Sequence, residues 1–142
     1  MKNCIFCKII KEEITSSKVY EDEYFIAFMD IQPINSGHVL VIPKIHQELI
    51  INLLDDNLVK GLMYIGCKIS KAMRKSNLKP EGVNFFLADG EAAGQEISHV
   101  HLHVIPRFKN DGFGFVFPKS YGRKPEKVTL DKIARDISSN LR

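Results

Sequence analysis

The chain has 142 residues, of which 44% are hydrophobic and 26% charged, and its formal net charge is only +3. This length suits one ordinary domain that builds its own hydrophobic core. The small, scattered positive charge argues against duplex nucleic acid as a partner, because such proteins usually concentrate basic residues on one face.

Neither a membrane segment nor a secretion signal is visible. No apolar run approaches the ~20 residues that cross a bilayer, and the stretch MKNCIFCKII has no small-residue cleavage site. The odd number of cysteines does not suggest a disulfide framework, and Cys67 lies in a helical pattern as a small buried hydrophobe. We therefore expect a cytoplasmic protein in which residues 1–142 form a single domain.

The first half of the chain alternates strand and helix patterns. Residues 18–31 predict two strands around an acidic turn, with the second strand covered on both faces, and residues 38–43 predict a third. Residues 46–54 predict a short helix. A long helix follows, which Asp55 or Asp56 can cap and which ends before the segment SNLKPEG.

The second half predicts strands at 83–88 and 99–106, joined by the loop DGEAAGQEIS, and a last short helix that Thr129 can cap. The apolar residues of that helix share one face: Leu130, Ile133, Ala134, Ile137 and Leu141. Strands grouped as hairpins, with one long helix and a C-terminal helix, indicate an α+β fold with an antiparallel sheet. Residues 108–142 are then an extension of the same domain.

Three of the five histidines, His99, His101 and His103, occupy alternate positions of the predicted strand 99–106. Side chains at such positions point to one face, so the imidazoles line up while the apolar residues between them pack on the other face. Imidazole is costly to bury, because each ring has a donor and an acceptor to satisfy. The row therefore indicates function, either as metal ligands or as a nucleophile with supporting histidines.

The loop before this row adds a second signal. Gly90 and Gly94 in DGEAAGQ let the backbone approach a ligand and offer amide groups to phosphate oxygens. The Gly-Lys-Ser/Thr ending of a P-loop is missing. A phosphate held beside an imidazole row indicates phosphoryl or nucleotidyl transfer.

The segment HVHLHV, together with CIFCKIIKEEI, VYEDEYFIAFMDIQPINSGHVLVIPKIH and ADGEAAGQEISHVHLHVIPR, resembles the histidine triad (HIT) superfamily. Within it, the chain is similar to the Hint-like branch of small homodimeric nucleotide-binding hydrolases and nucleotidyltransferases. The resemblance extends to about Phe108. It implies an antiparallel sheet that continues across a homodimer through the long helix and an edge strand.

The resemblance also implies roles for individual residues. His101 would attack the α-phosphorus of a purine nucleotide, and water would release the nucleoside monophosphate from the covalent adduct. His103 would contact the phosphate and assist proton movement, with His99 beside it in the row and His38 as a supporting histidine. Asp30 would hold the ribose hydroxyls, although its residue type also suits a turn before Gln32-Pro33.

The remaining ligand contacts implied by the resemblance come from two groups of residues. The phosphate loop contributes Gly94, Gln95 and Glu96, and the walls of the base pocket are Phe6, Ile9, Phe28, Ile31 and Leu40. Two positions depart from the family pattern: Ala88 replaces a usual asparagine, and Glu96 replaces a serine or threonine. These departures leave the leaving group open between a phosphoramidate and a dinucleoside polyphosphate. They also leave open a nucleotide-binding module with incidental turnover.

The pair Cys4-x-x-Cys7 is half of a tetrahedral zinc site, for which His46 and His99 are the available further ligands. Zinc-bearing bacterial relatives resemble this arrangement. Such a zinc would be structural, with no metal required directly for catalysis, because protein ligands would fill all four positions. Two unliganded cysteines remain the alternative, and a zinc-ordered interaction domain without a nucleotide is the least specific interpretation. The tail RFKNDGFGFVFPKSYGRKP either reaches the neighbouring protomer's site or forms a surface meander.

Overall fold

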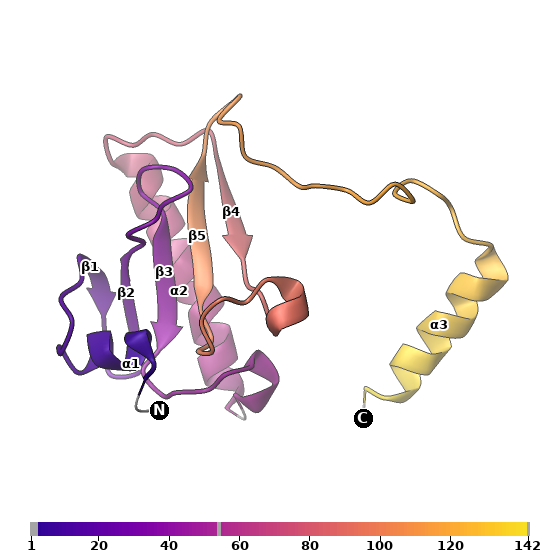
Figure 1. The fold of residues 1–142 in the computed structure, drawn as a ribbon, viewed down its shortest axis with the longest axis horizontal. Coiled ribbons are helices and arrows are strands. Elements are labelled where there is room, and N and C mark those ends of the chain that lie inside the picture. Colours follow the sequence, from indigo (N-terminus) through magenta and orange to yellow (C-terminus); the bar gives the residue numbers. More distant parts are fainter. Residues whose placement is uncertain (1–2, 54, 142) are drawn as a thin grey trace.

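A five-stranded antiparallel sheet, in the order β1-β2-β3-β5-β4, organises the chain (Figure 1). The structure is a computed structural model that describes residues 3–53 and 55–141. The strands are β1 (Lys18–Glu21), β2 (Phe25–Met29), β3 (Val39–Pro43), β4 (Gly82–Phe86) and β5 (Leu102–Arg107). The helices are α1 (Ile5–Ile10), α2 (Asp56–Lys75) and α3 (Lys127–Ser139), with short 3-10 turns η1 (Ile50–Asn52) and η2 (Glu91–Ala93). The predicted α+β class with an antiparallel sheet is confirmed.

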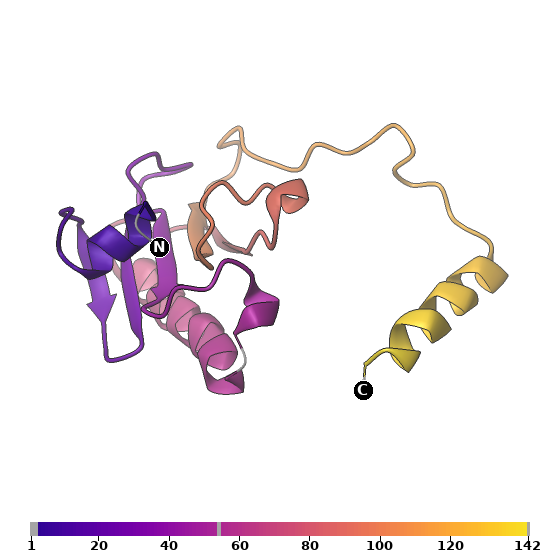
Figure 2. The ribbon, with the colours of Figure 1, turned by 60° about the horizontal axis from the view of Figure 1, so that its bottom comes forward.

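The two faces of the sheet carry separate apolar clusters. Helix α2 covers one face, where Leu62, Ile65 and Ile69 pack against Val41 and Val104. Helix α1 lies over the other face, so that β2 is buried on both sides as predicted (Figures 1 and 2). The apolar cluster under α1 is made of Phe6, Ile9, Ile26, Phe28, Leu40 and Ile42.

Local hydrogen bonds explain why the predicted turns and caps form. The Asp22 carboxylate accepts from the backbone amides of Tyr24 and Phe25, at 2.8 and 2.7 Å, and so closes the acidic turn between β1 and β2. Asp55 caps α2 by accepting from the Asn57 amide at 2.8 Å. Both predictions are confirmed.

Four local predictions were wrong. In place of a helix over 46–54 the chain has only the 3-10 turn Ile50–Asn52, with residue 54 outside the described residues. Cys67 is exposed rather than buried, because it lies on the outer face of α2. Helix α3 begins at Lys127 with Glu126 as its N-cap, so Thr129 lies inside the helix.

The fourth wrong prediction concerns the strand expected over residues 99–106. This strand, β5, starts three residues later than predicted, at Leu102. Its last pair with β3 is Val41–Leu102, because the chain before that point turns away: the Val100 amide bonds to the Gln47 carbonyl instead. This departure places His99 and His101 just outside the ladder.

Helix α3 stands apart from the sheet at the end of a long connection, in both views (Figures 1 and 2). None of its residues is buried. In the described part of the chain, no helix combines the length and the apolar character needed to cross a membrane.

Candidate functional site

The three histidines of the row share the sheet face that α1 covers, although only His103 belongs to β5. The rings of His101 and His103 lie 4.9 Å apart, and Phe6 contacts the rings of both His99 and His101 edge-on. His99 and His101 are almost fully buried. The intervening residues Val100, Leu102 and Val104 enter the opposite cluster against α2, as the alternation predicted.

Hydrogen bonds from the backbone assign a tautomer to the pair His38 and His103. The Ile34 amide donates to His38 Nδ1 at 3.2 Å, so the proton of a neutral His38 sits on Nε2. That Nε2–H then donates to His103 Nδ1 at 2.9 Å. A neutral His103 consequently carries its own proton on Nε2, which remains a donor for a ligand.

His101 is held as the other tautomer, with its proton on Nδ1. Its Nδ1 lies 2.7 Å from the carbonyl oxygen of His99, an acceptor that requires the proton on Nδ1. The Nε2 atom therefore keeps a free lone pair, which is the form a nucleophile or a metal ligand needs.

His99 is fixed by a second carbonyl. Its Nε2 donates to the Pro43 oxygen at 2.9 Å, which leaves the lone pair on Nδ1. That atom lies 3.5 Å from Cys4 Sγ and 3.7 Å from Cys7 Sγ. The side chain of His99 therefore contacts the cysteines, while its backbone carbonyl accepts the hydrogen bond from His101.

The site keeps its imidazoles neutral. Burial, and then the neighbouring His101 and His38, lower the pKa of His103 to about 4. Burial lowers the pKa of His99 to about 4 as well, with further contributions from His46 and His101 against the opposing bond to Pro43. The pKa values of His38 and His101 are also lowered, mainly by burial. All four rings are therefore unprotonated at neutral pH.

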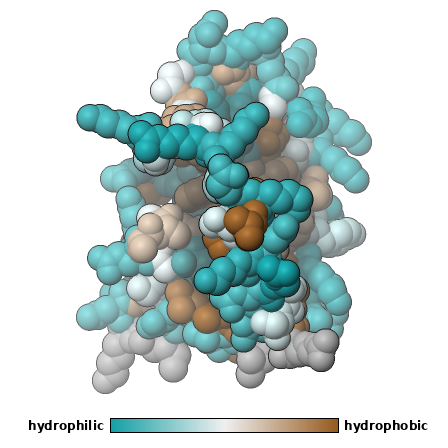
Figure 3. Space-filling view, turned by 90° about the vertical axis from the view of Figure 1, so that its right-hand side faces the viewer, coloured by the Kyte–Doolittle hydropathy of each residue, from teal (hydrophilic) through white to brown (hydrophobic). Residues whose placement is uncertain are grey.

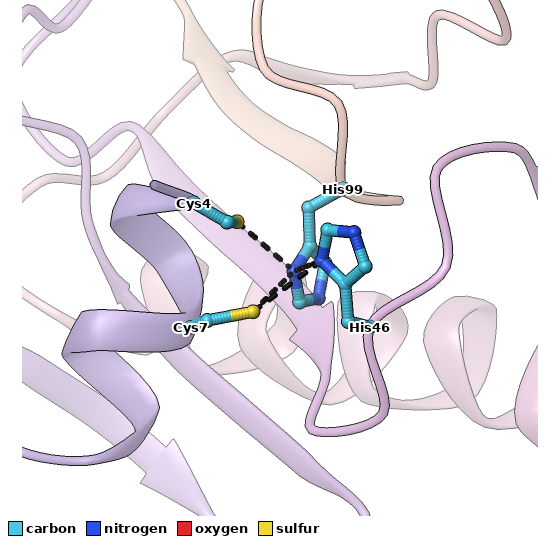
Figure 4. A group of neighbouring side chains, drawn as sticks. All are labelled: Cys4, Cys7, His46 and His99. Carbon is cyan, nitrogen blue, oxygen red and sulfur yellow. Dashed lines mark hydrogen bonds between the residues drawn. The ribbon is translucent and has the colours of Figure 1, made fainter. Parts of the chain in front are cut away.

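Four potential metal ligands lie close together (Figure 4). Cys4 and Cys7 come from the N-cap and the first turn of α1, His46 from the loop after β3, and His99 from the bend before β5. His46 Nδ1 lies 3.3 Å from both Cys7 Sγ and His99 Nδ1. Zinc–sulfur and zinc–nitrogen bonds of about 2.3 and 2.0 Å, set at tetrahedral angles, separate neighbouring ligand atoms by roughly 3.3–3.8 Å. The observed separations of 3.3 to 3.7 Å match that spacing, so these residues could hold a tetrahedral metal ion.

The predicted phosphate loop follows β4 and ends before His99. Gly90 and Gly94 have φ of +96° and +86°, and an added Cβ at either would meet no atom within 4 Å, so open space lies beside this backbone. The Gln95 side chain holds the loop in place through two hydrogen bonds. Its Oε1 accepts from the Gly90 amide at 2.7 Å, and its Nε2 donates to the Glu48 carbonyl at 2.7 Å. Glu96 is exposed, and its charge raises the pKa of His101 against the effect of burial.

Asp30 lies at the end of β2 beside the His38 and His103 pair. Its Oδ1 accepts from the Gln32 amide at 2.8 Å, as expected for a turn residue, while Oδ2 lies 3.7 Å from His38 Nδ1. Asp30, His38 and His103 together form a second group of close potential ligands.

Most of the apolar residues predicted for the base pocket gather next to the row. Phe6, Ile9, Phe28 and Leu40 belong to the cluster under α1, which the row borders. Ile31 does not join them, since it is 89% exposed. Ala88, which follows β4, is buried.

Sequence reasoning missed a polar cluster behind the row. Arg107 at the end of β5 donates to both carboxylate oxygens of Asp111 at 2.7 Å. Asn35, three residues before His38, donates to the same carboxylate at 2.8 Å and to the Pro106 carbonyl at 2.9 Å. This cluster ties the loop that carries His38 to β5, which carries His103. Common surface residue types at unremarkable spacing gave no signal of it.

Comparison with known proteins agrees with this geometry. The HIT domain family matches residues 11–110. An uncharacterized HIT-like protein from Borreliella burgdorferi is 46% identical over 99% of this chain and 100% of its own length. A protein from Saccharomyces cerevisiae named adenosine 5′-monophosphoramidase is 44% identical over 93% of this chain and 77% of its own.

Solved structures are similar over nearly the whole length. Crystal structures of HIT family proteins from Bacillus subtilis and Bacillus anthracis superpose with TM-scores of 0.86 and 0.88, at 43% and 42% identity, over 99% of this chain and 98% of theirs. A zinc-bound histidine triad family protein from Mycobacterium smegmatis superposes with a TM-score of 0.75 at 34% identity, over 99% of this chain and 96% of its own.

The lowered pKa of His103 predicts how stability depends on pH. The unfolded chain binds a proton at this side chain below pH 6.5, whereas the folded chain excludes it until about pH 4. The free energy of unfolding should therefore fall as the pH drops through this window, by up to about 1.4 kcal/mol per pH unit for this group. Urea unfolding of the wild type and His103→Asn at several pH values measures the difference in slope. Parallel pH profiles for the two proteins would contradict the assignment.

Proposed function

The chain belongs to the HIT domain family, and on this basis we propose that it is a hydrolase of purine nucleoside phosphoramidates. The reaction would cleave the bond between the α-phosphorus and nitrogen and release the nucleoside monophosphate. The observation that supports it best is the bond from His101 Nδ1 to the His99 carbonyl, because it leaves the Nε2 lone pair free to attack. The name of the yeast relative supports the same substrate class.

In the proposed reaction His101 Nε2 forms a bond to the α-phosphorus while the phosphorus–nitrogen bond breaks. The departing nitrogen takes the electron pair and a proton, for which His103 Nε2–H is the nearby donor in the tautomer assigned above. Backbone amides near Gly94 would receive the phosphate oxygens, since the space beside this glycine is open. Water then attacks the phosphorus and gives a proton to His103 Nε2 while the bond from His101 Nε2 to phosphorus breaks, which releases the monophosphate and restores both rings. No metal enters either step.

The nucleoside would extend from the row toward Asp30 and the cluster under α1. Asp30 Oδ2 is free of the turn bond that occupies Oδ1 and could accept a ribose hydroxyl. Phe6, Phe28 and Leu40 would contact the base. This arrangement would favour a ribonucleotide over a 2′-deoxy analogue.

Replacing His101 with alanine tests the proposal. Without the nucleophile, kcat on an adenosine phosphoramidate should fall by at least about a thousandfold, while Lys71→Ala on the exposed face of α2 should leave it unchanged. Acid-quenched wild-type enzyme should carry labelled nucleotide on His101. Equal turnover by wild type and His101→Ala would refute the role of this residue.

In the same assay, Asp30→Ala should reduce the preference for the ribose over the 2′-deoxy substrate.

We further propose that Cys4, Cys7, His46 and His99 bind a structural zinc ion. The support is the tetrahedral spacing of four ligand atoms, two of them thiols close to imidazole lone pairs. Bound zinc would tie the N-terminal helix to the bend before β5 and neutralise the thiolates. No coordination position on the zinc ion would remain for a catalytic water, because the protein supplies all four ligands.

Metal analysis of purified protein should find about one zinc per chain, and Cys4→Ser or Cys7→Ser should lose it and melt at a lower temperature. Cys67→Ser is the matched control, because this exposed thiol lies on α2 outside the cluster. Equal zinc content in Cys7→Ser and Cys67→Ser would exclude the site.

A homodimer formed across the β4 edge is also part of the proposal. Strand β4 is the last of the sheet. Phe85 is 37% exposed on the face covered by α2, where Met63 is 49% exposed, and Phe86 is 43% exposed on the opposite face, beside the ring of His103. A second copy paired there would continue the sheet and cover these side chains. Sedimentation equilibrium should give twice the mass of one chain, and a monomer at all concentrations would contradict it.

A cytoplasmic location fits the free thiols, and cell fractionation would test it.

A further inference from the structure

An enclosed carboxylate, that of Asp111, lies outside the histidine row. The surface on the side of α3 is largely hydrophilic (Figure 3), and polar side chains in contact with water need no explanation. Asp111 does, because its side chain is only 7% exposed and Arg107 holds the pKa of its carboxyl well below the ordinary value. Hydrogen bonds compensate the buried charge. Two come from Arg107, one from the Asn35 side chain, and one each from the backbone amides of Phe108 and Phe113.

Stability alone does not account for this ion pair. Replacing a buried ion pair by apolar side chains of similar volume is often neutral or stabilising, so the pair of Arg107 and Asp111 indicates another role. Its hydrogen bonds are directional, and they fix the relative position of the segments that they join. Those segments are β5, the chain just after β5 and, through Asn35, the loop between β2 and β3.

Asn35 joins the ion pair to the loop between β2 and β3. Its side-chain nitrogen donates to Asp111 Oδ2 at 2.8 Å and to the Pro106 carbonyl at 2.9 Å, so both of its N–H groups are in use. Two acceptors at this nitrogen leave one orientation of the amide group. The Asn35 backbone carbonyl accepts from the His38 amide at 3.0 Å. The position of Asn35 therefore sets the position of the turn that leads into His38.

This loop determines where the proton lies in the bond between His38 and His103. When both rings are neutral, the bond has two arrangements: His38 Nε2–H donates to His103 Nδ1, or His103 Nδ1–H donates to His38 Nε2. Only the first arrangement leaves a proton on His103 Nε2. It requires a lone pair on His38 Nδ1, and the Ile34 amide donates to that atom at 3.2 Å.

The Asp30 carboxylate favours the opposite arrangement. Its Oδ2 lies 3.7 Å from the same His38 Nδ1, which is too far for a hydrogen bond but would become close enough after a small shift. A proton on His38 Nδ1 would then be bonded to the carboxylate, and His103 Nε2 would hold a lone pair in place of its proton. A small displacement of the loop relative to His38 therefore decides between the Ile34 amide and Asp30.

We propose that Asn35, Arg107 and Asp111, here called the clamp, hold the loop between β2 and β3 in the position that keeps a proton on Nε2 of the last histidine of the row. Asn35 is thereby a positioning residue for His103, on which it acts through His38. The proton arrangement depends only on contacts within the folded chain. Its use as the proton donor of the reaction rests on the proposed function.

Nitrogen NMR of the histidine rings tests the clamp without any turnover. Long-range proton–nitrogen spectra at neutral pH distinguish a ring nitrogen that carries a proton from one that holds a lone pair, and His103→Asn assigns the signals of that ring. In the wild type, His103 should carry its proton on Nε2. Asn35→Leu has a side chain of similar size without donors. In it the ratio of the Nε2–H form to the Nδ1–H form should fall at least about tenfold, the scale of one lost hydrogen bond. An unchanged ratio would overturn the proposal.

Two further variants complete this test. Asp111→Asn replaces one acceptor oxygen by an NH₂ group that faces donors of the clamp, so it should shift the ratio in the same direction even if Asn35→Leu does not fold. Lys109→Gln is the matched control, because it removes only the exposed ion pair with Glu81, between Arg107 and Asp111 in the chain. It should leave the ratio unchanged. A shift of equal size in this control would overturn the specific role of Asn35.

Turnover of two substrates tests the use of the proton. An amine leaves phosphorus with a proton, whereas nitrophenolate leaves a p-nitrophenyl ester of adenosine monophosphate without one. In Asn35→Leu, kcat/KM should therefore fall at least about tenfold more on the phosphoramidate than on the ester. Equal losses on the two substrates would overturn the role of the clamp in proton donation. Inactivity of the wild type would count against the proposed function only, because the ring nitrogens test the clamp by themselves.

Discussion

The geometry of the whole site depends on where one residue, His99, is held. Its ring turns toward Cys4, Cys7 and His46, while its carbonyl oxygen accepts the Nδ1–H of His101 at 2.7 Å. The first contact belongs to the proposed metal centre and the second determines the tautomer of the proposed nucleophile. A carbonyl can hold a neighbouring ring only as firmly as its own backbone is held, and His99 lies in a bend outside the β-ladder. Its own backbone amide donates to the Ile97 carbonyl at 2.8 Å, and its side chain adds the bond from Nε2 to the Pro43 oxygen at 2.9 Å. The contacts with Cys4 and Cys7 and the tautomer of His101 therefore both involve this one residue.

Alternation along the same segment gives the row its register. Val100, Leu102 and Val104 are buried against α2, so a shift by one residue would move imidazoles into an apolar cluster and expose valines. The cost of that error is large, because the rings would lose the hydrogen-bond partners that they have in the structure without water to replace them. The hydrophobic core on one face therefore specifies the chemistry on the other. The cluster of Asn35, Arg107 and Asp111 acts in the same way on His38 and His103, by joining the two segments that carry them.

The sequence predicted those parts of the fold and the site that rest on periodicity or on strong residue chemistry. The common face of His99, His101 and His103 followed from a period of two, and the ligand set around Cys4 and Cys7 followed from their spacing with two available histidines. The start of β5 could not be predicted, since it depends on which carbonyl the Val100 amide finds after β3 and β5 diverge. Gln95 was expected to contact a ligand, and in the structure its side chain is hydrogen-bonded to its own loop and to Glu48, because an amide suits either role equally well. Helix α3 has the apolar pattern of a packed helix, but a pattern does not say whether the surface it packs on belongs to the same chain.

The charge of the site bears on which leaving group it would accept. Burial lowers the pKa of His38, His99, His101 and His103, so that the row carries little positive charge at neutral pH. Asp30 and Glu96 add negative charges that raise the pKa of His101 against the larger effect of burial. A dinucleoside polyphosphate brings several negative charges into this region, and the neutral row does not offset them. A phosphoramidate brings a single phosphate charge and a departing amine, which a nearby carboxylate attracts once the amine is protonated. This charge distribution supports the proposed cleavage of phosphorus–nitrogen bonds over cleavage of polyphosphates.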